Sequence, residues 1–324
     1  MPLSVKRLGR TFFAEVRGLD LREDLSDATV AEIRAAWMEH GVLVFPDQLL
    51  TDAQQVAFSL RFGPLEEDLI DPSKFIANLG NLDEDGKLRD PASLKSRFLR
   101  ANQLWHSDSA YFPAAAKLSF LNGRRIASDM EGGETQWADM RAAYDALDAD
   151  KRGALDGKVA KHDMQTSRAK TGRLLSPEER AKWPAVFHPM VRVHEETGRK
   201  ALYVGSQATC VVGWTDDESQ NLFAELMDFA TQDRFVHTHR WRQDDLVCWD
   251  NRRVVHRQVA FDEARFPRVV VRTTVRGTGP DVIDGKPVDE FVRLKILSVQ
   301  TQSSCPDLIG ASTQGASAPI RPTR

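Results

Sequence analysis

The sequence of 324 residues lacks the features that mark membrane proteins and nucleic-acid-binding proteins. No apolar run approaches the roughly 18 residues that a membrane helix needs, and the N-terminus has no long apolar segment of a secretory signal. Lysine and arginine number 44 against 47 aspartates and glutamates, and the two signs are interspersed, which gives a net charge of −3. We therefore expect neither a membrane nor nucleic acid as a partner.

Cysteine is scarce as well. Cys210, Cys248 and Cys305 are scattered and odd in number, so we expect neither a disulfide framework nor a CxxC metal pair. This scarcity favours a reducing, cytoplasmic compartment. No internal repeat is visible, and 41% hydrophobic residues is ordinary for a globular protein. The length suits two average domains or one large β-barrel enzyme.

The N-terminal part, residues 1–63, is predicted to be a layer of helices and strands. Ser26 can cap a helix that ends near Gly41, and the apolar run 41–45 predicts a buried strand. Thr51 opens a capping box for a second helix. The polar, turn-rich stretch 64–100 is expected to be a loop region beside the site, where substrate selection is common.

The stretch from residue 100 to 277 alternates short strands with a few capped helices. Strands are expected at 117–121, near 137, in a hairpin over 191–204, and in four stretches between 237 and 275. This pattern predicts a mainly β fold with helical decoration, a barrel or a double-sheet jelly roll. We expect one domain over residues 1–280 with its core at 100–277. A C-terminal extension would cover 281–324, with 301–324 disordered because it is rich in Ser, Thr, Gly, Ala and Pro.

The most informative short motif is His106-x-Asp108. If the chain is extended here, residues i and i+2 point to the same side, so an imidazole and a carboxylate converge. These are two of the three ligands of a 2-His-1-carboxylate triad, the usual holder of non-haem Fe(II) in oxygenases. A distant histidine must supply the third.

Of the eight histidines, His256 is the strongest candidate for the third ligand. It follows a strand and a tight turn, near the start of another strand. His237 and His239 form another same-face pair, which periodicity alone does not dismiss. They have no carboxylate at i+2, however, and no pair of downstream arginines matches them as Arg268 and Arg272 match His256.

Arg268 and Arg272 are four residues apart on a predicted strand. That spacing puts both on one face, about 13 Å apart at ~3.3 Å per residue. Two inward guanidiniums are costly unless each meets an anion, and arginine binds carboxylates through a planar fork. The pair therefore predicts two anionic ligands beside the metal, although pairing with an internal carboxylate remains an alternative.

Four motifs then occur in order: His106-x-Asp108, Gly132-Gly-Glu-Thr135, Trp249-Asp-Asn-Arg-x-x-x-His256 and Arg268-x-x-x-Arg272. Together they resemble the Fe(II)/2-oxoglutarate-dependent dioxygenases of the taurine dioxygenase and 2,4-dichlorophenoxyacetate dioxygenase family. The resemblance covers roughly residues 5–277 and is nearer to the phenoxyacetate branch. It implies the double-stranded β-helix, a jelly roll, as the fold.

The resemblance also implies a role for each matching residue. The expected Fe(II) ligands are His106, Asp108 and His256. The residues expected to hold the distal carboxylate of 2-oxoglutarate are Thr135 and Arg268. The residues expected on the substrate side are Arg272, for the anionic group, and Asn102.

The implied reaction is the hydroxylation of a small anionic substrate with O2, with succinate and CO2 as by-products. We favour an aryloxyalkanoate, a phenoxyacetate-type herbicide-like acid that would yield a phenol and an oxoacid; the alternative is taurine or another sulfonate. Asp108 disfavours halogenation, because related halogenases lack the ligand carboxylate. The phenoxyacetate branch tends to carry a histidine where this chain has Ser206-Gln-Ala-Thr209, which bears on the preferred substrate.

Two rivals of other classes are a non-catalytic metal-binding jelly-roll protein and a zinc-dependent hydrolase, since His/His/Asp sites also hold zinc. The hydrolase lacks an assigned general-base carboxylate and leaves Arg268 and Arg272 unexplained. For assembly, we expect a homo-oligomer between dimer and tetramer.

Overall fold

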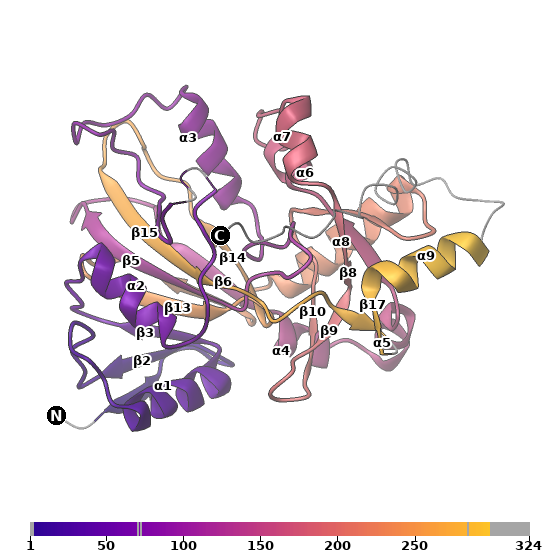
Figure 1. The fold of residues 1–324 in the computed structure, drawn as a ribbon, viewed down its shortest axis with the longest axis horizontal. Helices are drawn as coiled ribbons and strands as arrows, with labels where there is room; N and C mark the ends of the chain where they lie inside the picture. The colour runs from indigo at the N-terminus through magenta and orange to yellow at the C-terminus, as the bar shows by residue number, and fades with distance from the viewer. Residues whose placement is uncertain (1–2, 70, 72, 284, 299–324) are drawn as a thin grey trace, which may run out of the picture.

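The computed structural model describes residues 3–69, 71, 73–283 and 285–298. The expected disorder at 301–324 lies outside these residues. A seven-stranded sheet is its largest element (Figure 1). Its strands, in spatial order, are β1 (Ser4–Arg7), β2 (Ala14–Arg17), β3 (Val42–Phe45), β13 (Leu246–Asp250), β5 (Leu118–Ile126), β15 (Arg268–Val275) and β4 (Ala77–Asn78). Neighbours pair antiparallel except β2 and β3, which are parallel.

One face of this sheet is covered by α1 (Asp27–His40) and α2 (Asp52–Leu60), which Figure 1 shows at the N-terminal end of the molecule. Ser26 caps α1, and Thr51 forms a capping box with Gln54 at the start of α2, as the sequence predicted. The apolar faces of both helices pack on alternate strand residues such as Leu43 and Phe45. The two predicted helices and the buried strand between them are therefore present in the structure.

The other face of the large sheet packs on a second sheet, which has the order β12 (Val236–His239), β6 (Thr135–Asp139) and β14 (Val254–Gln258). Between the two sheets lie Val42 and Val44 from β3, together with Trp137 from β6 and Val254 from β14. Because successive strand residues point to opposite faces, β3 serves both layers at once. The result is two facing sheets with the site between them.

The outer face of the second sheet is covered by α4 (Met140–Asp145) and α8 (Asp216–Ala230), through Met140 and Leu226 among others. The remaining described elements are α3 (Leu94–Leu99), η1 (Arg100–Gln103), α5 (Ala149–Leu155), β7 (Val159–His162), α6 (Met164–Ala169), α7 (Pro177–Lys182), β8 (Val186–Pro189), β9 (Val191–Val193), β10 (Lys200–Leu202), β11 (Ala208–Val211), β16 (Val282–Ile283), β17 (Lys286–Pro287) and α9 (Val288–Ser298). A third sheet has the order β11-β7-β8, and β9 pairs with β10 as the predicted hairpin.

The architecture is thus a layered arrangement of sheets and helices, and the described strands form separate sheets, not one closed barrel. This corrects the barrel form of the prediction. Helices α3, α6 and α7 were also not anticipated. Cys248 is a buried free thiol. In the described part of the chain, no helix has the length and apolarity to cross a membrane.

The chain beyond Gly277 packs on the third sheet. Asp281 lies 2.6 Å from both His188 Nδ1 and Arg192 Nη2, and Val288 and Val292 contact Val159. An apolar contact therefore accompanies an ionic one along this segment. The predicted domain boundary near residue 280 stays a prediction.

Candidate active site

His106, Asp108 and His256 come together between the two large sheets. One potential ligand atom from each lies within 4.8 Å of the others, and all three residues are buried. The backbones of His106 and His256 pair with each other, with N···O distances of 3.0 and 2.8 Å. That bridge explains why two histidines far apart in the sequence meet. Asp108 lies in a turn, so the extended geometry expected for His106-x-Asp108 holds only at His106.

Both imidazoles are set up to be neutral ligands. The Nδ1 of His106 lies 2.7 Å from the Leu104 carbonyl, which fixes the proton there and leaves Nε2 free. Nδ1 of His256 has no hydrogen-bond partner among the described residues. Burial lowers the pKa of both rings, that of His256 well below its usual value.

Asp108 is held from three sides. Ser119 Oγ donates to Oδ2 at 2.6 Å, Arg272 Nη1 donates to Oδ1, and the Asp108 backbone N–H donates to Asn251 Oδ1 at 3.0 Å. Burial alone would raise the pKa of Asp108, but Arg272 and the two imidazoles outweigh it and lower the pKa to about 2. The carboxylate is therefore charged and ready to bind a cation.

Asn251 organises this side of the site. Its Nδ2 donates to Ser119 Oγ at 2.9 Å, and Trp249 Nε1 donates to its Oδ1 at 3.0 Å. Ser107 Oγ also donates to its backbone carbonyl at 2.7 Å. Asn251 thus connects the turn between β13 and β14 to the Asp108 backbone and to Ser119, which donates to the Asp108 carboxylate. A carboxylate ligand is commonly fixed by such outer hydrogen bonds.

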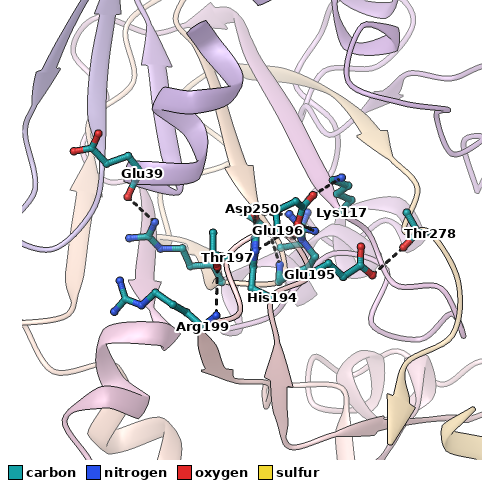
Figure 2. Close-up of polar contacts among 12 residues, drawn as sticks. Glu39, Lys117, His194, Glu195, Glu196, Thr197, Arg199, Asp250 and Thr278 are labelled. Carbon is teal, nitrogen blue, oxygen red and sulfur yellow. Dashed lines mark hydrogen bonds and ion pairs between the residues drawn. The ribbon is translucent and has the colours of Figure 1, made fainter. Parts of the chain in front are cut away.

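A cluster of charged, mostly buried residues adjoins that turn (Figure 2). Asp250 accepts two hydrogen bonds from Arg252, at 2.9 and 2.8 Å, and lies 2.8 Å from His194 Nε2. Glu196 pairs with Arg252 at 2.6 Å and with Lys117 at 2.7 Å. The hairpin β9-β10 is thereby tied to the turn that carries Asn251. We call these five residues the ion cluster.

The donor set fits a metal. Two imidazole nitrogens and one carboxylate, buried and preoriented, form the set that non-haem Fe(II) takes in oxygenases. His237 and His239, the alternative pair, take no part in it. His237 stacks on Phe13 with ring centroids 3.9 Å apart, and His239 Nε2 lies 3.1 Å from Asp245. Both belong to the packing around β12.

Arg268 marks one end of a small cavity of about 30 Å³ beside the metal-binding cluster. Its side chain is buried, and Nε donates to the Gly133 carbonyl at 3.0 Å. No carboxylate forms an ion pair with it among the described residues, and burial lowers its pKa to about 10. A buried guanidinium without a counter-ion is costly, so the cavity suits a ligand carboxylate.

Thr135 lies in the same cavity, with its Oγ1 accepting a hydrogen bond from Trp241 Nε1 at 2.9 Å. The two glycines before it, Gly132 and Gly133, have φ values of 77° and 75°, which favour glycine. This turn presents the Gly133 carbonyl to Arg268. The Gly-Gly-Glu-Thr motif and Arg268 therefore form one wall of the small cavity together.

A larger cavity of about 360 Å³ opens on the other side of the metal-binding cluster. Asn102, His106 and Arg272 line both cavities, so the two meet at the metal ligands. The apolar part of its lining comes from Leu69, Ile76, Leu79, Phe98 and Leu99, among others. The structure thus brings all seven predicted site residues to one place.

Sequence reasoning missed three contributors. Ser119 and Asn251 contact Asp108 or its partners, and Arg168 lines the larger cavity. Asn251 stood inside the Trp249-Asp-Asn-Arg motif, which was a usable signal. Arg168 stands in a stretch whose helices are too short to show a period. Ser206 and Gln207, where a histidine was noted as absent, also line that cavity.

Comparison with known proteins gives the site its context. The family described as "Taurine catabolism dioxygenase TauD, TfdA family" matches residues 4–274. The chain belongs to this family. The TauD/TfdA match ends just before the segment that packs on the third sheet, so α9 lies outside it.

Two relatives of this TauD/TfdA-family chain carry herbicide-related names. The alpha-ketoglutarate-dependent 2,4-dichlorophenoxyacetate dioxygenase of Cupriavidus pinatubonensis is 43% identical over 262 residues, covering 78% of this chain and 90% of the relative. The (S)-phenoxypropionate/alpha-ketoglutarate-dioxygenase of Sphingobium herbicidovorans is 38% identical over 264 residues, covering 79% and 88%. The chain is therefore similar to the phenoxyacetate branch, as the motifs predicted.

A solved structure agrees. The crystal structure of AAD-2 in complex with Mn(II) and N-oxalylglycine superposes with a TM-score of 0.82 at 38% identity, covering 88% of this chain and 100% of that one. These findings confirm the predicted enzyme class, a 2-oxoglutarate-dependent dioxygenase, and the buried His-Asp-His cluster fits the predicted iron. The non-catalytic and hydrolase alternatives lose their support.

Proposed function

We propose that this dioxygenase hydroxylates an aryloxyalkanoate at the carbon beside the ether oxygen. One observation carries the proposal: the His-Asp-His cluster opens on one side to a small cavity ending at an unpaired guanidinium and on the other to a larger, partly apolar cavity. The first suits a dicarboxylic cosubstrate, and the second suits an organic acid with an aromatic body. O2 is the remaining reactant.

His106, Asp108 and His256 would hold Fe(II), and Arg268 and Thr135 would bind the distal carboxylate of 2-oxoglutarate. When bound, iron and 2-oxoglutarate supply the oxidising chemistry. The protein's own contribution is to orient the reactants. Ser119 and Asn251 fix Asp108, the His106–His256 backbone bridge fixes the imidazoles, and the facing sheets exclude water from the buried ligands.

On the substrate side, Arg272 would bind the carboxylate, and Asn102 lies where both cavities meet. The apolar lining from Leu69, Ile76 and Leu79 would receive the aromatic body. Hydroxylation beside the ether oxygen gives a hemiacetal, which breaks down to a phenol and an oxoacid. Succinate and CO2 accompany them.

A sulfonate such as taurine is the alternative substrate class, because Arg272 would bind either anion. The volume and the apolar lining of the larger cavity favour the aromatic acid. Succinate release from wild-type enzyme with iron, 2-oxoglutarate and O2 should be measured over aryloxyacetates, aryloxypropionates and sulfonates. Phenol formation from the aryloxy acids is the expected result, and turnover of sulfonates alone would contradict it.

Three finer points complete the proposal. The two facing sheets would be the halves of a double-stranded β-helix, which the likeness to AAD-2 supports. The enzyme would act as a homo-oligomer between dimer and tetramer. It would work in the cytoplasm, where 2-oxoglutarate is available.

A further inference from the structure

The larger cavity contains a second buried guanidinium, Arg168, which none of the four sequence motifs includes. Arg168 lies on the short helix α6, and only 8% of the residue is exposed. Its Nε is fully buried and has no hydrogen-bond partner in the part of the chain that the structure describes. A buried charged group of this kind needs an anion from somewhere.

The described part of the protein offers Arg168 no anionic partner. The carboxylates that line the same cavity are those of Asp68, Asp71, Glu84 and Asp108. Among the described residues none of them forms an ion pair with Arg168. Asp71 pairs with Lys74 at 2.8 Å, and Asp108 pairs with Arg272. Burial, together with the charges of Arg272 and Arg173, lowers the pKa of Arg168 to about 10.

The position of Arg168 is fixed by an aromatic ring. Its guanidinium carbon lies 3.9 Å from the centroid of the Phe98 ring, which comes from α3 on the opposite wall of the cavity. Figure 1 shows α3 and α6 at the same end of the molecule, near one another. Stacking on a ring occupies one face of the guanidinium and leaves its edge, with the N–H donors, for a ligand. The fork is therefore preoriented.

Arg168 and Arg272 line the same cavity, and the charge of Arg272 contributes to the lowered pKa of Arg168. Two cations facing one cavity repel each other unless an anion lies between them. Arg272 lies beside the metal ligands, and Arg168 lies farther into the larger cavity, beside Ser167, Gln207 and Phe98. Together they line a part of the cavity where an anionic group would interact favourably with both guanidiniums.

We propose that Arg168 is a second substrate-binding arginine, which shares the substrate's carboxylate with Arg272 and thereby selects for anionic substrates. This inference rests on the proposed function and adds a residue to it. Binding between two forks orients the acid more tightly than one fork alone, and it places the adjacent carbon next to the metal ligands. Neutral analogues of the acid would gain nothing from Arg168.

Arg173 offers a matched control. It also lies near Phe98, with 5.3 Å between its guanidinium carbon and the ring centroid, but it has a partner of its own, Glu179 at 2.7 Å. If Arg168 only stabilised the contact between α3 and α6, replacing either arginine would affect the enzyme in the same way. If Arg168 binds the substrate, only its loss should depend on the charge of the ligand.

The experiment compares Arg168→Met, Arg168→Lys and Arg173→Met with wild type in the iron- and 2-oxoglutarate-loaded enzyme. Phenoxyacetate is the anionic probe, and phenoxyacetamide is the neutral probe, used as a substrate or as a competitive inhibitor. Arg168→Met should raise KM for phenoxyacetate about 30-fold with a smaller change in kcat. The KM of Arg168→Lys for phenoxyacetate should lie between those of wild type and Arg168→Met. The KM or inhibition constant of phenoxyacetamide should change less than about threefold in every variant.

Calorimetric titration of phenoxyacetate into the loaded enzyme without O2 should show the same order of affinities. An unchanged KM for the acid in Arg168→Met, or an equal loss for acid and amide, would overturn the inference while the proposed function stands. If wild type turns over only sulfonates, the proposed function fails, and the same comparison with a sulfonate and its sulfonamide decides the role of Arg168. If wild type binds neither anion, both ideas are overturned.

Discussion

At the scale of single residues, the site depends on groups that orient the metal ligands without touching the metal. Asn251 is the clearest case, because it bonds to the Asp108 backbone, to Ser119 and to Trp249. The sequence could predict His106, Asp108 and His256 because chemistry restricts which side chains bind iron. It could not predict Arg168, because an arginine outside any motif is indistinguishable from a surface arginine until burial is known.

Asn251→Ala should therefore weaken iron binding. The Asp108 backbone and the Ser119 side chain would lose a shared hydrogen-bond partner, and loss of such outer contacts typically costs about 10- to 100-fold in metal affinity or activity. The dissociation constant for Fe(II), measured without O2, checks this. Gln136→Ala is a suitable control, since Gln136 lies on β6 and bonds to Thr238 and Arg257, away from the ligands. Equal iron affinity in wild type and Asn251→Ala would contradict the role.

Glu66 predicts a pH dependence of stability. Burial raises its pKa to about 7 from a usual value of 4.5, although Ser109 Oγ donates to its Oε2 at 2.6 Å. The folded state therefore binds a proton that the unfolded state releases between these values. Its contribution to stability is full below pH 4.5 and is lost as the pH rises through about 7.

Glu66→Gln should remove this dependence. Urea unfolding of the metal-free protein at pH 5 and pH 8 measures it. The stability of wild type relative to Glu66→Gln should fall by on the order of 2 kcal/mol between the two pH values. Parallel stabilities across this range would mean that the Glu66 carboxyl titrates normally.

At the scale of elements, turns and capping residues determine where most of the helices begin and end. The capped helices α1, α2 and α8 could be predicted because Ser26, Thr51 and Thr215 are strong local signals. Helices α3, α6 and α7 are six residues each, too short to show an apolar period, and they were missed. Of these, α3 and α6 border the larger cavity, so the substrate side was the part that the sequence defined least.

The ion cluster predicts a large effect on folding stability. Arg252 neutralises both Asp250 and Glu196, and it is 7% exposed. Arg252→Met would leave the buried Asp250 carboxylate with His194 as its remaining side-chain partner and Glu196 with Lys117. Breaking a buried ion pair costs about 3–5 kcal/mol of unfolding free energy, and the remaining partners put the expected loss at the lower end of that range. Adding Asp250→Asn should recover part of the loss, because it removes one uncompensated charge.

Chemical denaturation of the two variants and wild type checks this. Arg22→Met serves as the control, since Arg22 pairs with Asp20 on the exposed surface and should have little effect. A loss in Arg252→Met as small as in the control would show that the hairpin β9-β10 does not depend on the ion cluster. Asn251 would then have to be held by β13 and β14 alone.

At the scale of the whole molecule, two facing sheets bring residues from distant parts of the chain to one point. Sequence patterns predicted the sheet class, but the strand order β3-β13-β5-β15 pairs segments up to two hundred residues apart, which local patterns do not encode. The order matters for function, because it puts Arg268 and Arg272 of β15 beside the ligands carried by β14 and the 104–108 segment. The site is a product of the fold as a whole.

The most direct test of the central claim uses the whole enzyme with Fe(II) and 2-oxoglutarate in the absence of O2. A visible metal-to-ligand charge-transfer band should appear in wild type, because we propose that the His-Asp-His cluster binds the metal and that Arg268 binds the cosubstrate beside it. The band should be lost in His106→Ala. In Arg268→Met, a much higher concentration of 2-oxoglutarate should be needed for the band to develop fully. No band in wild type, or an undiminished band in His106→Ala, would contradict the account.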